Sequence, residues 1–491
     1  MKISRRAFLK ATGALALVPT GCTHLASQPG REFVNDVQSQ LNGTRVKGVI
    51  EVRSRAQLES VIKRAAEGAQ PLSVCGGRHA MGGQQFLTDN LLLDTKPLRS
   101  VLKFDPDGGT IEVEAGIQWP ELLKYLLSKQ NDPQRTWTFA QKQTGANRFC
   151  LGGSLGSNIH SRGLTMKPFV SDLESFTLVD ACGTLRKCSR TENHELFRLA
   201  IGSYGLFGVV YSVTLRLVPR RKLQRIVEFL SVEEMMAAFG RRIEDGFLYG
   251  DFQFAIDRDS QDFLKRGIFS CYRPVPLETP IAPRRRLTSG DWLDLMYGAH
   301  VQPTRAFEEY SRYYRSTSGN IYWSDLHQFS GYLDDFHKVI DRRMKAAHPA
   351  SEVITEIFVP RARLAEFMEA ARRDFRKNGV TVIYGTIRLI ERDDETFLAW
   401  ARESFACIIF NLHTVRTTQG IQHSAGAFRR LIDLAASFRG SYYLTYHKFA
   451  SRRQLETCYP EFPEFLARKR KFDPQEIFQS DWYRHYRDEP I

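Results

Sequence analysis

The chain has 491 residues and a net charge of +14, and it is 42% hydrophobic and 25% charged. This length exceeds one compact core, so we expect two or three folded units, and the composition excludes a disordered, collagen-like or coiled-coil protein. Eight cysteines without a Cys-x-x-Cys pair exclude a disulfide scaffold and a zinc ribbon. The basic runs at 220–222, 284–286 and 468–471 lack interleaved aromatics, which favours solvated surface charge over a nucleic-acid site.

Residues 1–30 differ from the rest of the chain, because they are basic at the start and then weakly apolar. Arg5 and Arg6, followed by Phe8, Leu9 and Lys10, resemble a twin-arginine export signal. The apolar run behind them is too short to span a membrane reliably. The resemblance implies export to the periplasm or envelope by a route that carries folded proteins, often with cofactor already bound.

A cysteine at the end of this segment leaves open whether the exported protein carries a lipid anchor. Cys22 follows Gly21 at the end of the apolar run, where a lipoprotein acylation site can lie. A lipid anchor at Cys22 and a plain cleaved signal are both compatible with the sequence.

Residues 38–222 alternate between helical and strand periodicities, which predicts a mixed α/β unit. Ser54 and Gln57 predict a capping box at the start of a helix that ends at Gly68. We expect a further helix over 119–130 and a hairpin that joins 176–180 to 184–188. Strands are expected over 71–75, 91–94, 110–116 and 209–217.

Residues 223–440 predict a second unit of short strands and amphipathic helices. Strands are expected over 250–256, 353–360 and 380–388, and helices over 364–375 and 428–438. Residues 270–320 are rich in Pro and Arg and are expected to form a loop or lid. In the segment 441–491 we expect a helix over 461–473.

Three glycine-rich stretches could bring backbone close to a ligand. They cover residues 75–84, 151–163 and 202–210. Without Cβ atoms, consecutive N–H groups can face one concavity and hold a diphosphate. Neither the Rossmann nor the P-loop spacing is present. Taken singly, the first stretch could equally be a tight turn with a structural histidine, and the second a close-packed crossing of sheets.

In this order, the three stretches resemble the FAD-binding domain of the vanillyl-alcohol oxidase superfamily. The stretch before His79 is similar to the family's Gly-Gly/Arg-Gly-His-Ser loop, and the end of the chain is similar to its Tyr-Pro-x-Phe closing segment. Cytokinin dehydrogenases, aldonolactone oxidases and decaprenylphosphoryl-ribose oxidase are the relatives implied. The resemblance implies an α+β fold: a PCMH-type FAD-binding domain over 38–222, a substrate or cap domain over 223–440, and a tail, 441–491, that returns to the first domain.

The resemblance also implies which residues hold FAD. Several family members bond a histidine at the position of His79 covalently to the flavin, so the bond here can be covalent or non-covalent. Arg78 and Ala80 depart from the family's usual Gly and Ser. Cys150 lies too close in sequence to the following glycines to match the cysteine of doubly linked members. The implied cofactor-binding residues are Gly76, Gly77, Arg78, His79, Ala80, Gly82, Gly83, Gly152, Gly153, Ser154, Ser157, Asn158, Gly208, Val209, Val210 and Tyr443.

For catalysis, the resemblance points to His160 beside the flavin and to the stretch containing Tyr446, His447 and Lys448. A base within this set would take the substrate proton, and a cation such as Lys448 would stabilise the reduced flavin. Three further residues of the middle region, Glu356, Arg388 and Tyr384, are candidate substrate-facing groups, although an acid and an arginine on a sheet can simply form a salt bridge.

Two other chemistries are disfavoured. His327, His337 and His413 are isolated and have no metal-ligand spacing, so no metal is expected. Ser154 lies in a Gly-x-Ser-x-Gly pattern, but the polar residues before it do not suit the buried strand of a hydrolase nucleophile elbow.

The sequence therefore predicts an exported FAD-dependent oxidoreductase that moves a hydride from a CH–OH substrate (a sugar, alcohol or lactone) or a CH–NH substrate to flavin N5. Oxygen or an external carrier would be the electron acceptor, and no nucleic-acid partner is expected. The alternatives are an FAD-binding redox-sensing or envelope-assembly protein without turnover, and a basic envelope-binding protein without cofactor.

Overall fold

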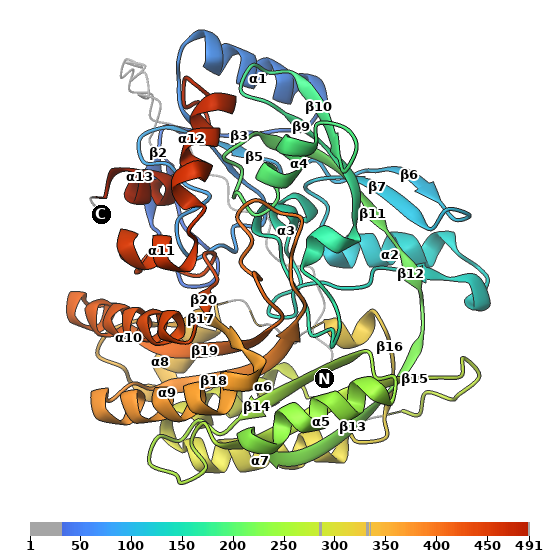
Figure 1. Ribbon diagram of the computed structural model, residues 1–491, viewed down its shortest axis with the longest axis vertical. Coiled ribbons are helices and arrows are strands. Elements are labelled where there is room, and N and C mark those ends of the chain that lie inside the picture. The colour runs from blue at the N-terminus through green and yellow to red at the C-terminus, as the bar shows by residue number, and fades with distance from the viewer. Residues whose placement is uncertain (1–31, 284–286, 330–332, 334, 490–491) are drawn as a thin grey trace, which may run out of the picture.

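The computed structural model describes residues 32–283, 287–329, 333 and 335–489. Figure 1 shows two regions, a first region in its upper half and a second region in its lower half. The expected export signal and Cys22 lie outside the described residues. Within the described part of the chain, no helix is long and apolar enough to cross a membrane.

The first region is built on a parallel three-stranded sheet, ordered β3-β5-β4, and an antiparallel five-stranded sheet, ordered β10-β9-β11-β7-β6. Helix α1 begins where Ser54 accepts a hydrogen bond from the Gln57 N–H, but the Gln57 side chain accepts from Arg53 N–H, so the expected capping box is only half formed. The region contains β1 (Glu32–Val34), β2 (Thr44–Val46), β3 (Gly48–Glu51), α1 (Arg55–Glu67), β4 (Leu72–Cys75), β5 (Leu91–Asp94), β6 (Val101–Asp105), β7 (Thr110–Glu114), α2 (Trp119–Lys129), β8 (Trp137–Thr138), α3 (Leu151–Ser157), β9 (Leu173–Val179), β10 (Leu185–Ser189), α4 (His194–Ala200), β11 (Val209–Arg216) and β12 (Val218–Pro219).

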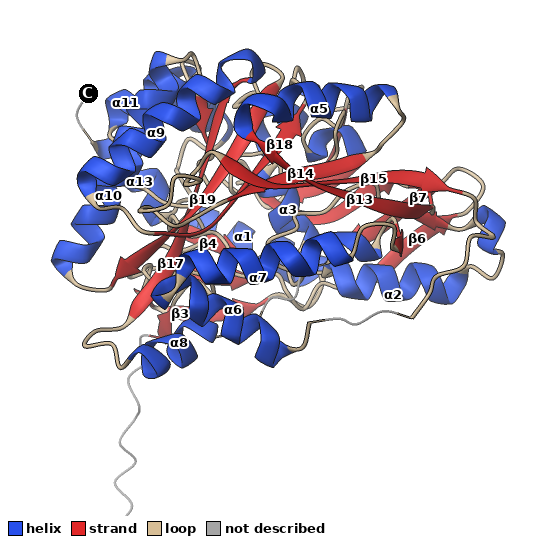
Figure 2. Ribbon diagram, turned by 90° about the horizontal axis from the view of Figure 1, so that it is seen from below, coloured by secondary structure: helices blue, strands red, loops and turns tan. Residues whose placement is uncertain are grey.

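The second region is an eight-stranded sheet, ordered β16-β13-β15-β14-β18-β19-β17-β20. Figure 2 shows α5, α9 and α10 on one face of this sheet and α6, α7 and α8 on the other. The region contains β13 (Lys222–Ser231), α5 (Val232–Glu244), β14 (Tyr249–Phe254), β15 (Arg266–Val275), α6 (Ser289–Val301), α7 (Pro303–Ser316), β16 (Ile321–Trp323), α8 (Phe336–Met344), β17 (Ala350–Pro360), α9 (Leu364–Asn378), β18 (Val382–Ile390), β19 (Phe405–Val415) and α10 (Thr418–Ser437).

The two faces of this sheet differ in polarity because side chains alternate along each strand. The face under α9 and α10 is apolar, as the packing of Phe375 against Phe410 shows. The opposite face carries charged and polar groups, among them Glu356 on β17 and Arg388 on β18. We call it the polar face; it is the face covered by α6 and α7.

The prediction of a loop or lid over 270–320 is wrong for most of this stretch. Residues of this stretch form the end of β15 and the helices α6 and α7. Thr288 caps α6 and exchanges hydrogen bonds with Asp291, and a proline at its first position starts α7. The Thr-x-x-Asp pattern at 288–291 is a capping signal that predicts the start of a helix. The prolines and arginines around it favoured a loop instead.

The tail leaves the second region and packs on the first. It contains β20 (Ser441–Tyr442), α11 (Arg452–Cys458), α12 (Phe462–Phe472) and α13 (Asp481–Asp488). Strand β20 pairs with β17, and further on Leu72 of β4 exchanges backbone hydrogen bonds with Ile477 and Gln479. The tail thus ties the two regions together.

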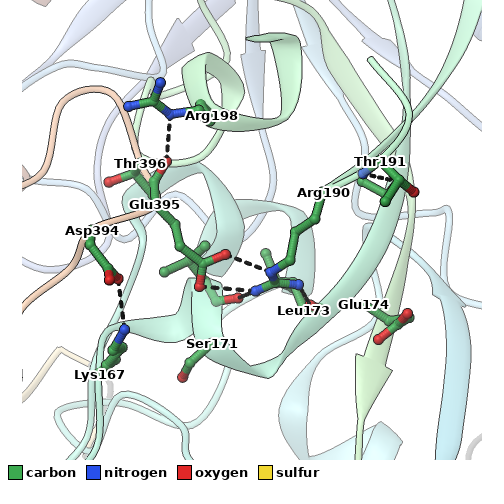
Figure 3. Close-up of polar contacts among 12 residues, drawn as sticks. Lys167, Ser171, Leu173, Glu174, Arg190, Thr191, Arg198, Asp394, Glu395 and Thr396 are labelled. Carbon is green, nitrogen blue, oxygen red and sulfur yellow. Dashed lines mark hydrogen bonds and ion pairs between the residues drawn. The ribbon is translucent and has the colours of Figure 1, made fainter. Parts of the chain in front are cut away.

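A loop of the second region, residues 391–404, is held to the first region by charged groups, as Figure 3 shows. Arg190 forms a bidentate pair with Glu395, with distances of 2.6 and 3.1 Å, and Arg198 Nε donates to the Glu395 carbonyl. Lys167 lies 2.6 Å from Asp394. These contacts fix the orientation of the second region over α3.

Candidate functional site

A cavity of about 1290 Å³, counted out to the solvent at its mouth, lies between the first region and the polar face. Thirteen of the sixteen residues expected to bind the cofactor line it: Gly76, Gly77, Arg78, His79, Ala80, Gly152, Gly153, Ser154, Ser157, Gly208, Val209, Val210 and Tyr443.

The loop after β4 turns sharply along one wall of this cavity. Arg78 adopts a positive φ of 58°, a conformation that L side chains seldom adopt. Its guanidinium pairs with Asp94 at 3.2 Å, which holds the residue in this conformation. The loop is further fixed by a hydrogen bond from Met81 N–H to the carbonyl of Thr445 in the tail.

Helix α3 forms the opposite wall, and its glycines have different functions. A Cβ on Gly152 would lie 2.8 Å from the Ala115 Cβ, so this glycine allows the helix to pack on the strand end. A Cβ on Gly153 would meet no atom within 4 Å, because Gly153 faces the open cavity. The Ser154 hydroxyl is buried and accepts a hydrogen bond from Trp119 Nε1, so it does not project as a hydrolase nucleophile would.

The third glycine-rich stretch places backbone at the cavity where β11 begins. Gly208 has a φ of 148°, and a Cβ there would lie 2.8 Å from the Val179 carbonyl oxygen. Only glycine fits this conformation and spacing. It lets the backbone of Val209 and Val210 reach the cavity wall.

His79 is held in one neutral tautomer at the cavity wall. Its Nε2 lies 3.2 Å from the carbonyl oxygen of Arg148, which can only accept, so Nε2 carries the proton. Its Nδ1 accepts from the Gln38 side-chain amide at 2.9 Å. Burial lowers the pKa of His79 to about 4, in agreement with a neutral ring.

A buried pair of titratable groups lies directly behind the wall formed by Tyr443 and Tyr446. His160 Nε2 lies 2.6 Å from Glu356 Oε1, and both side chains are fully buried. His160 Nδ1 donates to the Ser161 carbonyl at 3.0 Å, so Nε2 is the ring nitrogen that faces the Glu356 carboxylate. Burial, followed by the charge of Glu356 among other neighbours, raises the pKa of Tyr446 well above its ordinary value.

Polar atoms beside this pair have no partner within the described residues. They share the polar face and are buried: Glu356 Oε2, Arg388 Nε, Thr386 Oγ1 and Asn411 Oδ1. Buried polar groups are normally hydrogen-bonded, so a set of orphans on one face points to a polar ligand or ordered water. Tyr384 lies opposite Asn411 on the same face.

Six of the expected site residues do not line the cavity. One is His160, described above, and five others follow. His447 points to the other side of the sheet, where its Nε2 contacts Thr355 Oγ1 at 3.0 Å and its ring stacks on Phe428. Asn158 ends α3, and its side chain donates to Asp393 of the 391–404 loop. The remaining three are Gly82, Gly83 and Lys448, and the Lys448 ammonium lies close to Gly83.

Several residues of the site have no signal in the sequence. Gln85 lines the cavity with a buried Oε1 that has no partner within the described residues. Lys142 is fully buried, and its ammonium donates to three backbone carbonyls, of Gln143, Ala146 and Gln328. Burial and then the nearby Arg162 and Arg388 lower the pKa of Lys142 to about 7.

The cavity suits a dinucleotide with a flat ring. Glycine backbone faces it from three separate stretches, Gly153 and Gly145 leave open space in front of them, and no group of the described residues donates to Gln85 Oε1. Residues 46–189 match the family described as FAD binding domain.

Named relatives extend this comparison. The L-gulonolactone oxidase of Bos taurus is 28% identical over 185 residues, which cover 37% of this chain and 39% of that enzyme. Cytokinin dehydrogenase 3 of Oryza sativa subsp. japonica is 28% identical over 204 residues, 40% of this chain and 36% of that enzyme. The chain thus spans well under half the length of these two relatives. The L-gulono-1,4-lactone dehydrogenase of Mycobacterium tuberculosis is 21% identical over 446 residues, 89% of this chain and 95% of that enzyme.

Proposed function

We propose, from the premise that this chain belongs to the vanillyl-alcohol oxidase superfamily of FAD-binding oxidoreductases, that it oxidises a hydroxyl-bearing carbon of an aldonolactone or a related polyhydroxylated substrate. Two relatives are named for gulonolactone oxidation. The observation that carries the proposal is the buried His160–Glu356 pair beside the cavity, with orphan polar atoms next to it.

In this proposal the FAD lies in the cavity between the Gly76–Ala80 loop and α3 and, when bound, supplies the hydride acceptor. Glu356 takes the hydroxyl proton, since its buried carboxylate lies beside Tyr446 of the cavity wall, while His160 on Oε1 holds the carboxylate in place. The Arg388 Nε donates to a substrate oxygen. Tyr443 lines the cavity and is anchored by its hydroxyl to the Ser157 carbonyl at 2.7 Å.

The number of orphan atoms supports a hydroxyl-rich substrate over an apolar amine. Glu356, Thr386 and Asn411 offer buried oxygen atoms, and Arg388 offers a buried N–H, all on the polar face. A lactone with several hydroxyl groups could satisfy each of these atoms, whereas an apolar side chain would leave them unpaired at a cost of about 1–3 kcal/mol each.

The test is anaerobic reduction of the purified, flavin-loaded protein. We expect L-gulono-1,4-lactone or a related sugar acid lactone to bleach the flavin, and an N-alkylated purine not to do so. Glu356→Gln should keep its flavin but be reduced about 10²–10⁴-fold more slowly, whereas Glu366→Gln, an exposed control on α9, should behave as the wild type. Bleaching by the purine alone would reject the substrate class, and no bleaching by any alcohol, lactone or amine would indicate a redox-sensing protein without turnover.

Three finer features are part of the proposal. The electron acceptor is oxygen or an external carrier, which is distinguished by reoxidising the reduced protein with air or with a quinone. His79 lines the cavity and is the candidate for a covalent bond to the flavin, which can equally be held non-covalently. Residues 1–30 direct export by the twin-arginine route to the periplasm or envelope, with Cys22 as a candidate lipid attachment site.

A further inference from the structure

A second cluster of ligating side chains lies on the same polar face, away from the cavity. Glu352 on β17 pairs directly in register with His413 on β19, and both meet His300 from the last turn of α6. Glu352 Oε1 lies 2.8 Å from His300 Nε2 and 3.1 Å from His413 Nδ1. The three ligand atoms all lie within 4.8 Å of one another.

The hydrogen bonds of His300 match those of a metal ligand. Its Nδ1 lies 2.7 Å from the Met296 carbonyl oxygen, which can only accept, so Nδ1 carries a proton. Nε2 then faces the Glu352 oxygen either with a second proton or with a cation between the two atoms. Metal-bound histidines commonly donate their other N–H to a backbone carbonyl, which fixes the ring as it is fixed here.

The surroundings of Glu352 also favour a bound cation. The residue is only 8% exposed, and its second oxygen, Oε2, is buried without a hydrogen-bond partner within the described residues. The carbonyl end of α6 adds negative potential at the same place.

We propose that His300 Nε2, the Glu352 carboxylate and His413 Nδ1 bind a divalent transition-metal ion, zinc before others, with water as the fourth ligand. Two imidazoles and one carboxylate are a common zinc donor set, and four-coordinate zinc with one water needs three protein ligands. The side chain of His413 is 19% exposed, which leaves a path for water and for the ion.

Such an ion would cross-link α6 to β17 and β19. Glu352 precedes Glu356 by four residues on the same strand, a separation of about 13 Å at the usual rise per residue. The ion would thus stay out of the proposed reaction and hold the α6 layer over the polar face. The inference does not depend on the proposed substrate.

The experiment is equilibrium dialysis of the full, flavin-loaded protein, purified without a histidine tag and stripped with a chelator, against Zn²⁺. Elemental analysis should find about one zinc per chain. Glu352→Gln and His413→Ala should weaken zinc binding by about 100-fold or more. The matched control His348→Ala removes an exposed histidine from the same region and should retain the zinc.

Cys407 needs its own control, because it forms a separate group with His160 and Glu356. Cys407→Ser should retain the zinc, and X-ray absorption of the wild-type protein should find only nitrogen and oxygen around it. The second measurement needs no variant and so does not depend on the folding of Glu352→Gln. Sulfur in the zinc shell, loss of zinc in Cys407→Ser, or equal zinc binding by wild type and Glu352→Gln would each overturn the proposal.

Discussion

Replacing Gly153 by valine should separate flavin binding from folding. A Cβ at Gly153 would meet nothing within 4 Å, so the protein itself has room for a side chain there. Gly153 also lies within α3, where glycine is a poor helix former, so the free energy of unfolding should change by about 1 kcal/mol or less. The space that the valine would fill is part of the cavity proposed for the cofactor.

The expected loss of FAD affinity follows from overpacking, which costs about 1–3 kcal/mol, or about 5- to 150-fold in the dissociation constant. The assay is titration of flavin-free protein with FAD, followed by quenching of tryptophan fluorescence, with urea unfolding of the same samples. Gly240→Val is the matched control, since Gly240 lies in helix α5 with equally open space but away from the cavity. Unchanged FAD affinity in Gly153→Val, or an equal loss in Gly240→Val, would refute the assignment of this space to the cofactor.

Three further predictions concern a buried histidine, the flavin linkage and export. Burial and then Arg429 lower the pKa of His447 to about 3, so the unfolded chain takes up the proton first and stability falls by about 1.4 kcal/mol per pH unit as the pH drops from about 6.5 towards 3. His447→Gln should flatten this slope in urea unfolding at pH 7, 6 and 5; an unchanged slope would contradict a neutral buried ring. Acid precipitation decides the linkage of the flavin: yellow colour in the wild-type pellet and none in the His79→Ala pellet indicates a covalent bond, and colour in both supernatants excludes one. Replacing Arg5 and Arg6 by lysines should keep the protein in the cytoplasm, and normal export of this variant would argue against the twin-arginine route.

The sequence predicted elements well where one local pattern decides them. The helix over 119–130, the hairpin around Gly183 and the tail helix are confirmed as α2, β9–β10 and α12, because apolar periodicity, a tight turn and a proline stop are all local signals. The stretch 270–320 shows the opposite case. Its prolines and arginines suggested a loop, whereas packing against the polar face stabilises α6 and α7.

The candidate site shows the same division. Glycine-rich stretches could be found one by one because backbone proximity requires glycine locally, and they converge on one cavity. The opposite directions of Tyr446 and His447 depend on the neighbouring strand β17, on which Glu356 and Thr355 alternate between its two faces. Likewise, no spacing along the chain predicts that His413 contacts Glu352 beside His300, because strand register and the position of α6 bring these residues together.

The most direct test of the whole account is the visible absorption spectrum of the wild-type protein in an anaerobic cuvette, before and after one equivalent of an aldonolactone. We expect an oxidised flavin spectrum that loses its long-wavelength band when the lactone is added and regains it when the acceptor enters. A flavin spectrum that no hydroxylated substrate changes would contradict the proposed oxidation at the His160–Glu356 pair.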